Sequence, residues 1–171
     1  SLFATGYGIY KGYYSELSDL EFGEMFAGGI ATAVKAYKTS GSEMASAISA
    51  LGGTATSANV PLEEQLSVLG MLQATMSGSE AATKYKALLN AATGAGEKLG
   101  LNFLDADKQL RSLPEILGIL KSKYGDTIDA VEKKKIKEAF GSDEAVAVID
   151  LLYGKTGELQ TGILDMYDAL G

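Results

Sequence analysis

Short apolar stripes with helical spacing recur along this sequence, and most lie between a helix-capping residue and a glycine. Ser18 precedes a stripe that runs to about Lys38, and Pro61 opens another in which Glu63 and Glu64 face the positive end of the helix dipole. Glycine after a stripe favours a helix end, because it readily adopts the left-handed conformation found there. The pattern predicts a mainly all-α protein of about seven or eight short helices, packed as an irregular bundle.

The expected helices share these start and stop signals and are rich in alanine and leucine, which favour helices. Their approximate ranges are residues 18–38, 40–51, 61–72, 77–93, 114–124, 126–140, 142–153 and 157–170. We divide the chain into a Gly/Tyr-rich N-terminal segment at residues 1–17, a helical core domain at 18–154 and a C-terminal helix at 155–171. A length of 171 residues suits one domain with at most a small appendage.

One stretch departs from helical spacing. Leu101, Phe103 and Leu110 flank a polar tip at Asp105–Lys108, and tips of this composition form short hairpins or Asx turns. We therefore expect one small β-hairpin-like insertion near residues 101–111.

The composition excludes several kinds of chemistry. The chain has no Cys and no His, so it lacks disulfides, thiol nucleophiles, most zinc sites and histidine acid–base catalysis. A formal net charge of −7 and a pI near 4.6 argue against nucleic-acid recognition, which needs Lys and Arg opposite phosphate. The uncharged stretch at 44–62 contains Gly52, Gly53 and Pro61, which would break a helix in lipid, so we expect no membrane span.

Two glycine-containing stretches imitate nucleotide-binding loops. Gly154–Thr156 has the ending of a phosphate loop, but Ile149 stands where that loop needs its first glycine. Gly6, Gly8 and Gly12 have the wrong spacing for a dinucleotide loop. We interpret the first as a helix end with a polar turn, and neither as a cofactor site.

Asp105 and Asp107 imitate the opening of a calcium loop. Such a loop needs glycine at its sixth position and glutamate at its twelfth, and Leu110 and Ile116 stand there. A turn is the better interpretation, and we predict no metal-binding residue.

Two groups of charged residues could suggest a function: the glutamates a glycosidase pair, and the lysine run a nucleic-acid-binding patch. Glu63, Glu64, Glu132 and Glu138 have simple explanations as helix-start or solvated residues, and no aromatic cleft accompanies them. Lys133–Lys137 is flanked by glutamates, as expected for the solvent-exposed face of a helix. We predict no catalytic residue and no enzymatic activity.

Four weak motifs follow one another in order. They are Asn59–Glu64, Ser77–Thr83, Leu99–Leu101 leading through an Asp-centred turn to Leu113–Leu117, and Ala139–Ala145. Together, from about residue 33 to 154, they resemble the core region of the phage tail tape measure family. Lys108 and Ala82 depart from the glycines that the family usually has at those positions.

The resemblance implies a virion structural protein of a phage or prophage. It would be a fragment of a longer chain that sets tail length during assembly and acts in genome delivery. The implied partners are tail tube protein and tail assembly chaperones, with self-association, in the virion tail and in the host cytoplasm during assembly. Two alternatives stay open: a peptidoglycan-cleaving domain of a tail protein, and an unrelated acidic helical interaction module.

Overall fold

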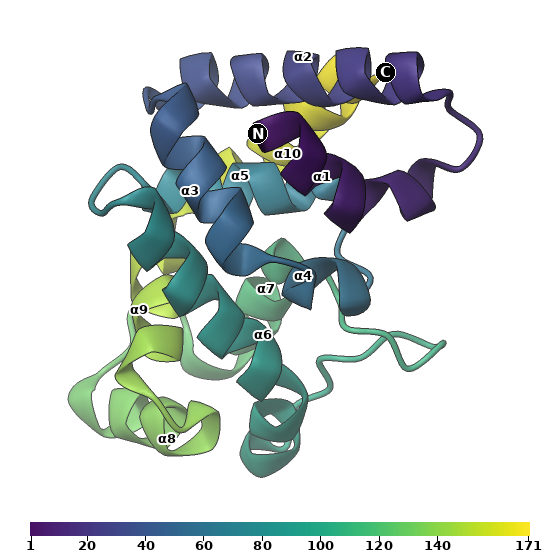
Figure 1. Cartoon of the computed structure of the whole chain (residues 1–171). Helices are drawn as coiled ribbons and strands as arrows, with labels where there is room; N and C mark the ends of the chain where they lie inside the picture. Colours follow the sequence, from purple (N-terminus) through teal and green to yellow (C-terminus); the bar gives the residue numbers. More distant parts are fainter.

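The computed structural model describes residues 1–171, and its regular structure is helical (Figure 1). The α-helices are α1 (Leu2–Tyr10), α2 (Asp19–Tyr37), α3 (Gly41–Leu51), α4 (Thr54–Ser57), α5 (Leu62–Leu72), α6 (Gly78–Leu99), α7 (Leu113–Tyr124), α8 (Ala130–Phe140), α9 (Asp143–Leu152) and α10 (Thr156–Leu170). Two 3-10 turns, η1 (Lys11–Tyr14) and η2 (Tyr153–Lys155), follow α1 and α9. The prediction of a mainly all-α protein is confirmed.

Helix α5 is the centre of the bundle. It contacts α2, α6 and α10, and nine of its eleven residues are buried, so it has almost no solvent face. The apolar stripe expected after Pro61 lies in the core, because Leu62, Leu66, Leu69 and Leu72 are all buried. A helix apolar on most sides is expected only where other helices enclose it.

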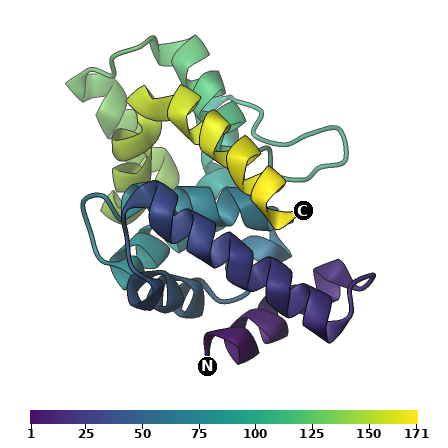
Figure 2. The same cartoon turned by 90° about the horizontal axis from the view of Figure 1, so that it is seen from above.

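The other helices form layers around α5. The long helix α6 packs against α3 on one side and against α8 and α9 on another. Helix α10 returns across α5 and α2, so that the C-terminus lies near α2 (Figures 1 and 2). Helix α1 packs on the start of α2, where the ring of Tyr10 lies 5.7 Å from that of Phe26. No helix of the protein is both long and apolar enough to cross a membrane.

Helix starts follow the capping residues closely. Ser18, Ser112 and Asp129 each form a capping box, in which the cap side chain and the third helical residue bond each other's backbone N–H. The helix expected at residues 126–140 therefore begins later than predicted, because Asp129 caps it and has Glu132 three residues on.

Three predictions about helices need correction. Thr93 does not end α6, which continues to Gly100, where the backbone is left-handed with φ +69°. Gly96 within this helix leaves room for the Phe103 ring and the Leu101 carbonyl oxygen, which both lie 3.0 Å from where a Cβ would be. Helices α1 and α4 were not among the expected seven or eight, because α1 is rich in glycine and α4 is a single turn.

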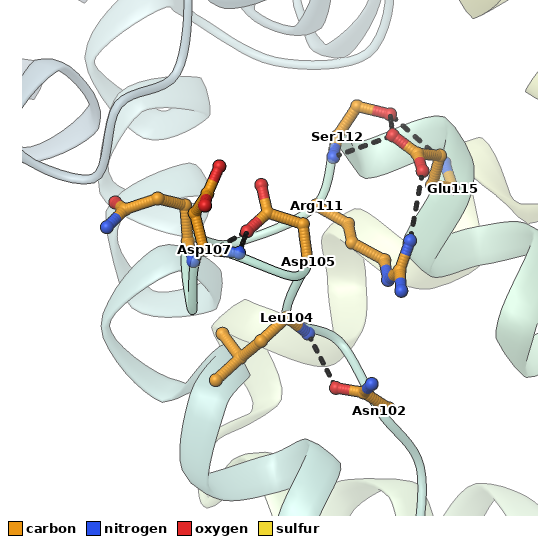
Figure 3. A network of polar contacts seen from close by, with 8 residues as sticks. Asn102, Leu104, Asp105, Asp107, Arg111, Ser112 and Glu115 are labelled. Carbon is orange, nitrogen blue, oxygen red and sulfur yellow. Dashed lines mark hydrogen bonds and ion pairs between the residues drawn. The ribbon is translucent and has the colours of Figure 1, made fainter.

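The prediction of a β-hairpin-like insertion at residues 101–111 was also wrong. The segment is a loop with one isolated antiparallel bridge, between Leu104 and Leu110, and no strand. Asp105 explains this, since its Oδ1 accepts hydrogen bonds from the N–H groups of Asp107 (2.8 Å) and Gln109 (3.0 Å) (Figure 3). The Asx turn was the correct alternative.

Candidate functional site

A groove of about 700 Å³ lies between α2, α5 and α10. Small residues line much of it, and Lys155, Glu158 and Asp165 stand at its rim. The groove is open to solvent, and no buried polar side chain without a hydrogen-bond partner lines it. An open groove of this kind is typical of the surface between packed helices, whereas a substrate pocket is usually enclosed.

Tyr37, one of the residues that line this groove, fills a slot made by two glycines. A Cβ at Gly70 of α5 would overlap the Tyr37 ring, and a Cβ at Gly162 of α10 would overlap its hydroxyl oxygen. The ring is therefore in close contact with two backbones, and α2, α5 and α10 meet at this one side chain. The sequence carries no signal that would pair Tyr37 with these two glycines.

Gly154–Thr156, considered above as a phosphate loop, lies at the junction of η2 and α10. Thr156 is the first residue of α10, and its hydroxyl donates to the carbonyl of Tyr153 at 3.3 Å. Lys155 is exposed. The segment is thus a turn between two helices, in agreement with the interpretation as a helix end.

A buried polar network joins α1, α4 and α5 through Gln65. The Gln65 side-chain nitrogen donates to the Val60 carbonyl (2.8 Å) and to the Thr56 hydroxyl (3.2 Å). Its oxygen accepts a bond from the Tyr10 hydroxyl at 3.1 Å, and burial raises the Tyr10 pKa. The amide thereby satisfies three groups that would otherwise be buried without partners. Sequence reasoning missed Gln65, whose only signal is a polar residue within a stripe of leucines.

Glu64 is the most perturbed carboxyl group of the protein. Its side chain is almost wholly buried, at 4% exposure, and Oε2 accepts a hydrogen bond from the backbone N–H of Leu113 at 3.1 Å. Burial raises the pKa of Glu64 to about 7, the Leu113 N–H lowers it, and the charges of Glu63 and Glu115 raise it further. Glu64 lies in the first turn of α5, as expected for a helix-start residue, and its carboxylate in addition accepts a bond from the start of a different helix.

Among the other acids considered as a catalytic pair, Glu63 precedes Glu64 on α5, whereas Glu132 and Glu138 lie on α8. Glu63 is half-buried on α5. Glu132 accepts the Asp129 N–H at 3.0 Å within the α8 capping box, and Glu138 is exposed on α8. Helix α8 packs against α6 and α9, so these side chains stand on a different part of the bundle.

The basic run on α8 divides into paired and unpaired lysines. Lys133 forms an ion pair with Asp150 (2.9 Å) and Lys137 with Asp143 (2.9 Å), which fastens α8 to α9. Lys134 and Lys135 are exposed and form no ion pair.

The Asp105 carboxylate in the Asp-rich turn accepts hydrogen bonds from backbone N–H groups of the same turn. Besides the two bonds to Asp105, the Asn102 side chain accepts the Leu104 N–H at 3.1 Å, and Arg111 pairs with Glu115 at 3.5 Å (Figure 3). Asp107 is exposed, and the structure contains no group of three or more metal-ligating side chains.

These features define a helical protein whose polar groups serve mainly to fix helices to one another. The chain matches the phage-related minor tail protein family over residues 16–141, well over half of its length. It belongs to that family, and is thus a structural component of the phage tail. Neither a curated protein nor a solved structure matches it.

Proposed function

We propose that this chain is the globular core of a tail tape measure protein. The observation that carries the proposal is the coincidence of the four ordered motifs with helix boundaries. Asn59–Glu64 begins α5, Ser77 caps α6, Gly100 ends α6, and Gly141 ends α8. The match to the minor tail family covers residues 16–141 and so contains the first three motifs entire.

In this role the parent chain occupies the tail while tube subunits polymerise around it, and it leaves ahead of the DNA during infection. The tail tube protein and the tail assembly chaperones are its partners, in the host cytoplasm during assembly and in the virion afterwards. Such a scaffold acts through apolar faces and length, and the proposal assigns it no enzymatic activity.

Departure from the tail tests this role. Mass spectrometry of purified tails, before and after DNA ejection is triggered, measures the amount of peptides from residues 1–171 relative to tube protein. We expect the peptides in full tails and a loss of most of them after ejection. Equal amounts in both would contradict a role in which the chain leaves ahead of the DNA.

A peptidoglycan-cleaving activity is the second candidate, and Glu64 is the observation that favours it. Carboxyl groups with a raised pKa act as general acids in glycosidases. Against it, Glu64 is 4% exposed and its carboxylate already bonds Leu113. Zymography on purified cell wall decides between the candidates: we expect no clearing, and clearing that the Glu64→Gln change abolishes would establish the enzyme.

A further inference from the structure

Side-chain hydrogen bonds and ion pairs hold most helices of the bundle to one another, but none holds α10. Glu43 of α3, for example, accepts the Gly78 N–H of α6 at 2.6 Å, and two ion pairs fasten α8 to α9. The last such bond along the chain joins the Tyr153 hydroxyl in η2 to the Gly125 carbonyl. No side-chain hydrogen bond or ion pair joins α10 to another α-helix, so apolar contacts alone keep it on the bundle.

The apolar contacts of α10 form one narrow stripe. Leu159 and Met166 are the buried residues among its fifteen, whereas nine of the eleven residues of α5 are buried. Near the C-terminus Leu170 reaches α2, since its Cδ2 atom lies 2.5 Å from where a Cβ of Gly29 would be. The groove of about 700 Å³ lies along one flank of α10, and Figure 2 shows this helix, in yellow, along its whole length. Helix α10 is thus packed on one side only.

Helix α10 has little to stabilise it apart from this stripe. Leu164 and Tyr167 are 66% and 64% exposed, so two of its large apolar side chains contribute little to docking. Gly157 and Gly162 lie within the helix, no side chain caps its N-terminus, and no Lys or Arg lies in its last turn. An isolated helix of this length is marginal in water, so α10 stays helical only while it is docked.

The connection between α9 and α10 can act as a hinge. The 3-10 turn η2 contains Gly154, and Gly157 lies in the first turn of α10. Neither glycine has another atom within 4 Å of the position that a Cβ would take, so packing does not confine the backbone there. A 3-10 stretch between two helical segments often marks a hinge. Because its hydroxyl bonds Gly125, Tyr153 stays with the bundle, and the movable part begins after it.

We propose that α10 is a detachable strap, which docks and undocks as one unit about the Gly154–Gly157 turn while the bundle before it stays folded. Undocking uncovers a strip of α2 and α5. The Tyr37 hydroxyl and the Ser67 Oγ belong to this strip, since they lie 2.2 and 3.8 Å from where a Cβ of Gly162 would be. Segments held by few buried contacts are the ones that open locally. The inference rests on the packing of α10 and does not depend on the tape measure role.

The reactivity of a single introduced thiol measures undocking, because the chain has no cysteine of its own. Ser67→Cys places a thiol of similar size at a fully buried position beneath α10. Ala92→Cys, at a fully buried position of α6, reports only on unfolding of the bundle. With a disulfide reagent under native conditions, we expect the thiol at position 67 to react at least about 100-fold faster than the thiol at position 92. Equal rates would overturn the proposal.

Two matched leucine changes show whether α10 controls this reactivity. Added to Ser67→Cys, Leu159→Ala removes a buried contact of α10 and should speed the reaction at least about 10-fold. Leu164→Ala makes the same change on the exposed face and should alter the rate by less than about 2-fold. Added to Ala92→Cys, Leu159→Ala should leave the rate unchanged. Equal acceleration at both thiols, or by both leucine changes, would mean that α10 does not open separately from the bundle.

Hydrogen exchange of the unaltered full chain tests the proposal without any substitution and separates undocking from fraying of the helix end. Amides from Leu159 to Met166 should exchange together, at least about 100-fold faster than those of α5. Fast exchange confined to the last turn of α10, with the amides around Leu159 as slow as those of α5, would be fraying alone and would overturn the proposal.

Discussion

The carboxylate of Glu64 on α5 accepts a hydrogen bond from the backbone N–H of Leu113, the first residue of α7, at 3.1 Å. This bond joins residues 49 positions apart in sequence and fixes the end of the 101–112 loop to the centre of the bundle. The carboxylate lies at the positive end of the α7 dipole, which favours its charge, whereas burial opposes it.

Protonation of Glu64 makes the stability of the fold depend on pH. Its pKa is raised from 4.5 to about 7, so the folded state holds the proton more tightly than the unfolded state. The contribution of Glu64 is therefore fully present below pH 4.5 and is lost as the pH rises through about 7. Between these limits we expect a loss of up to about 3 kcal/mol in the free energy of unfolding.

Glu64→Gln removes this titration but keeps an acceptor for Leu113. Urea denaturation from pH 4.5 to 8 should show a flatter pH profile for the variant and greater stability than the wild type at pH 8. Glu63→Gln, on the half-buried neighbour, is the matched control and should keep the slope. Identical profiles for wild type and Glu64→Gln would show that Glu64 does not titrate as proposed.

Replacing Gln65 should loosen the attachment of α1 to the core. Gln65→Leu leaves the Tyr10 hydroxyl, the Thr56 hydroxyl and the Val60 carbonyl without this partner, which costs about 1–3 kcal/mol for each group left unsatisfied. Hydrogen exchange in α1 should quicken. Tyr10→Phe in the Gln65→Leu background should cost less than in the wild type, and equal costs would mean that the two side chains are not coupled.

The glycine slot around Tyr37 gives a prediction with a built-in rescue. Gly162→Ala should destabilise the protein by about 1–3 kcal/mol, because the new methyl group overlaps the Tyr37 hydroxyl. Tyr37→Phe, made in the Gly162→Ala variant, removes that oxygen and should recover part of the lost free energy of unfolding. Gly94→Ala, in a helix with nothing within 4 Å of the added carbon, is the control and should stabilise by up to about 1 kcal/mol. Thermal unfolding of the four proteins measures all these changes.

Truncation of the core should be costly. Leu66 and Leu117 are fully buried, so Leu66→Ala and Leu117→Ala should each lower the free energy of unfolding by about 2–5 kcal/mol. Leu164→Ala, at a side chain 66% exposed, should change it by less than about 0.5 kcal/mol in the monomer. Chemical denaturation that found similar losses at all three positions would show that the helix faces are wrongly assigned.

Local sequence signals predicted most of the helices because caps and apolar periodicity act within a few residues. Ser18, Pro61 and Gly141 each stand at the end of the helix they were expected to begin or end. Gly96 shows the limit of such signals, since glycine inside α6 is explained by the Phe103 ring that approaches it.

The candidate site was harder to predict, because it depends on contacts between distant segments. Glu64 looks like an ordinary acidic residue in the first turn of α5, and only the return of the chain to Leu113 makes it a buried cap. The slot of Tyr37 likewise needs glycines from two helices that are far apart in sequence. The pairing of such residues is decided by the packing of the bundle.

Tail length is the most direct test of the tape measure role. A phage whose gene encodes about 60 additional helical residues ahead of Ser1 should build tails about 90 Å longer, at about 1.5 Å per residue, as measured by electron microscopy. An equal deletion from helical sequence of the parent chain should shorten them by a similar amount. Tails of unchanged length that contain the lengthened chain would contradict the proposed function.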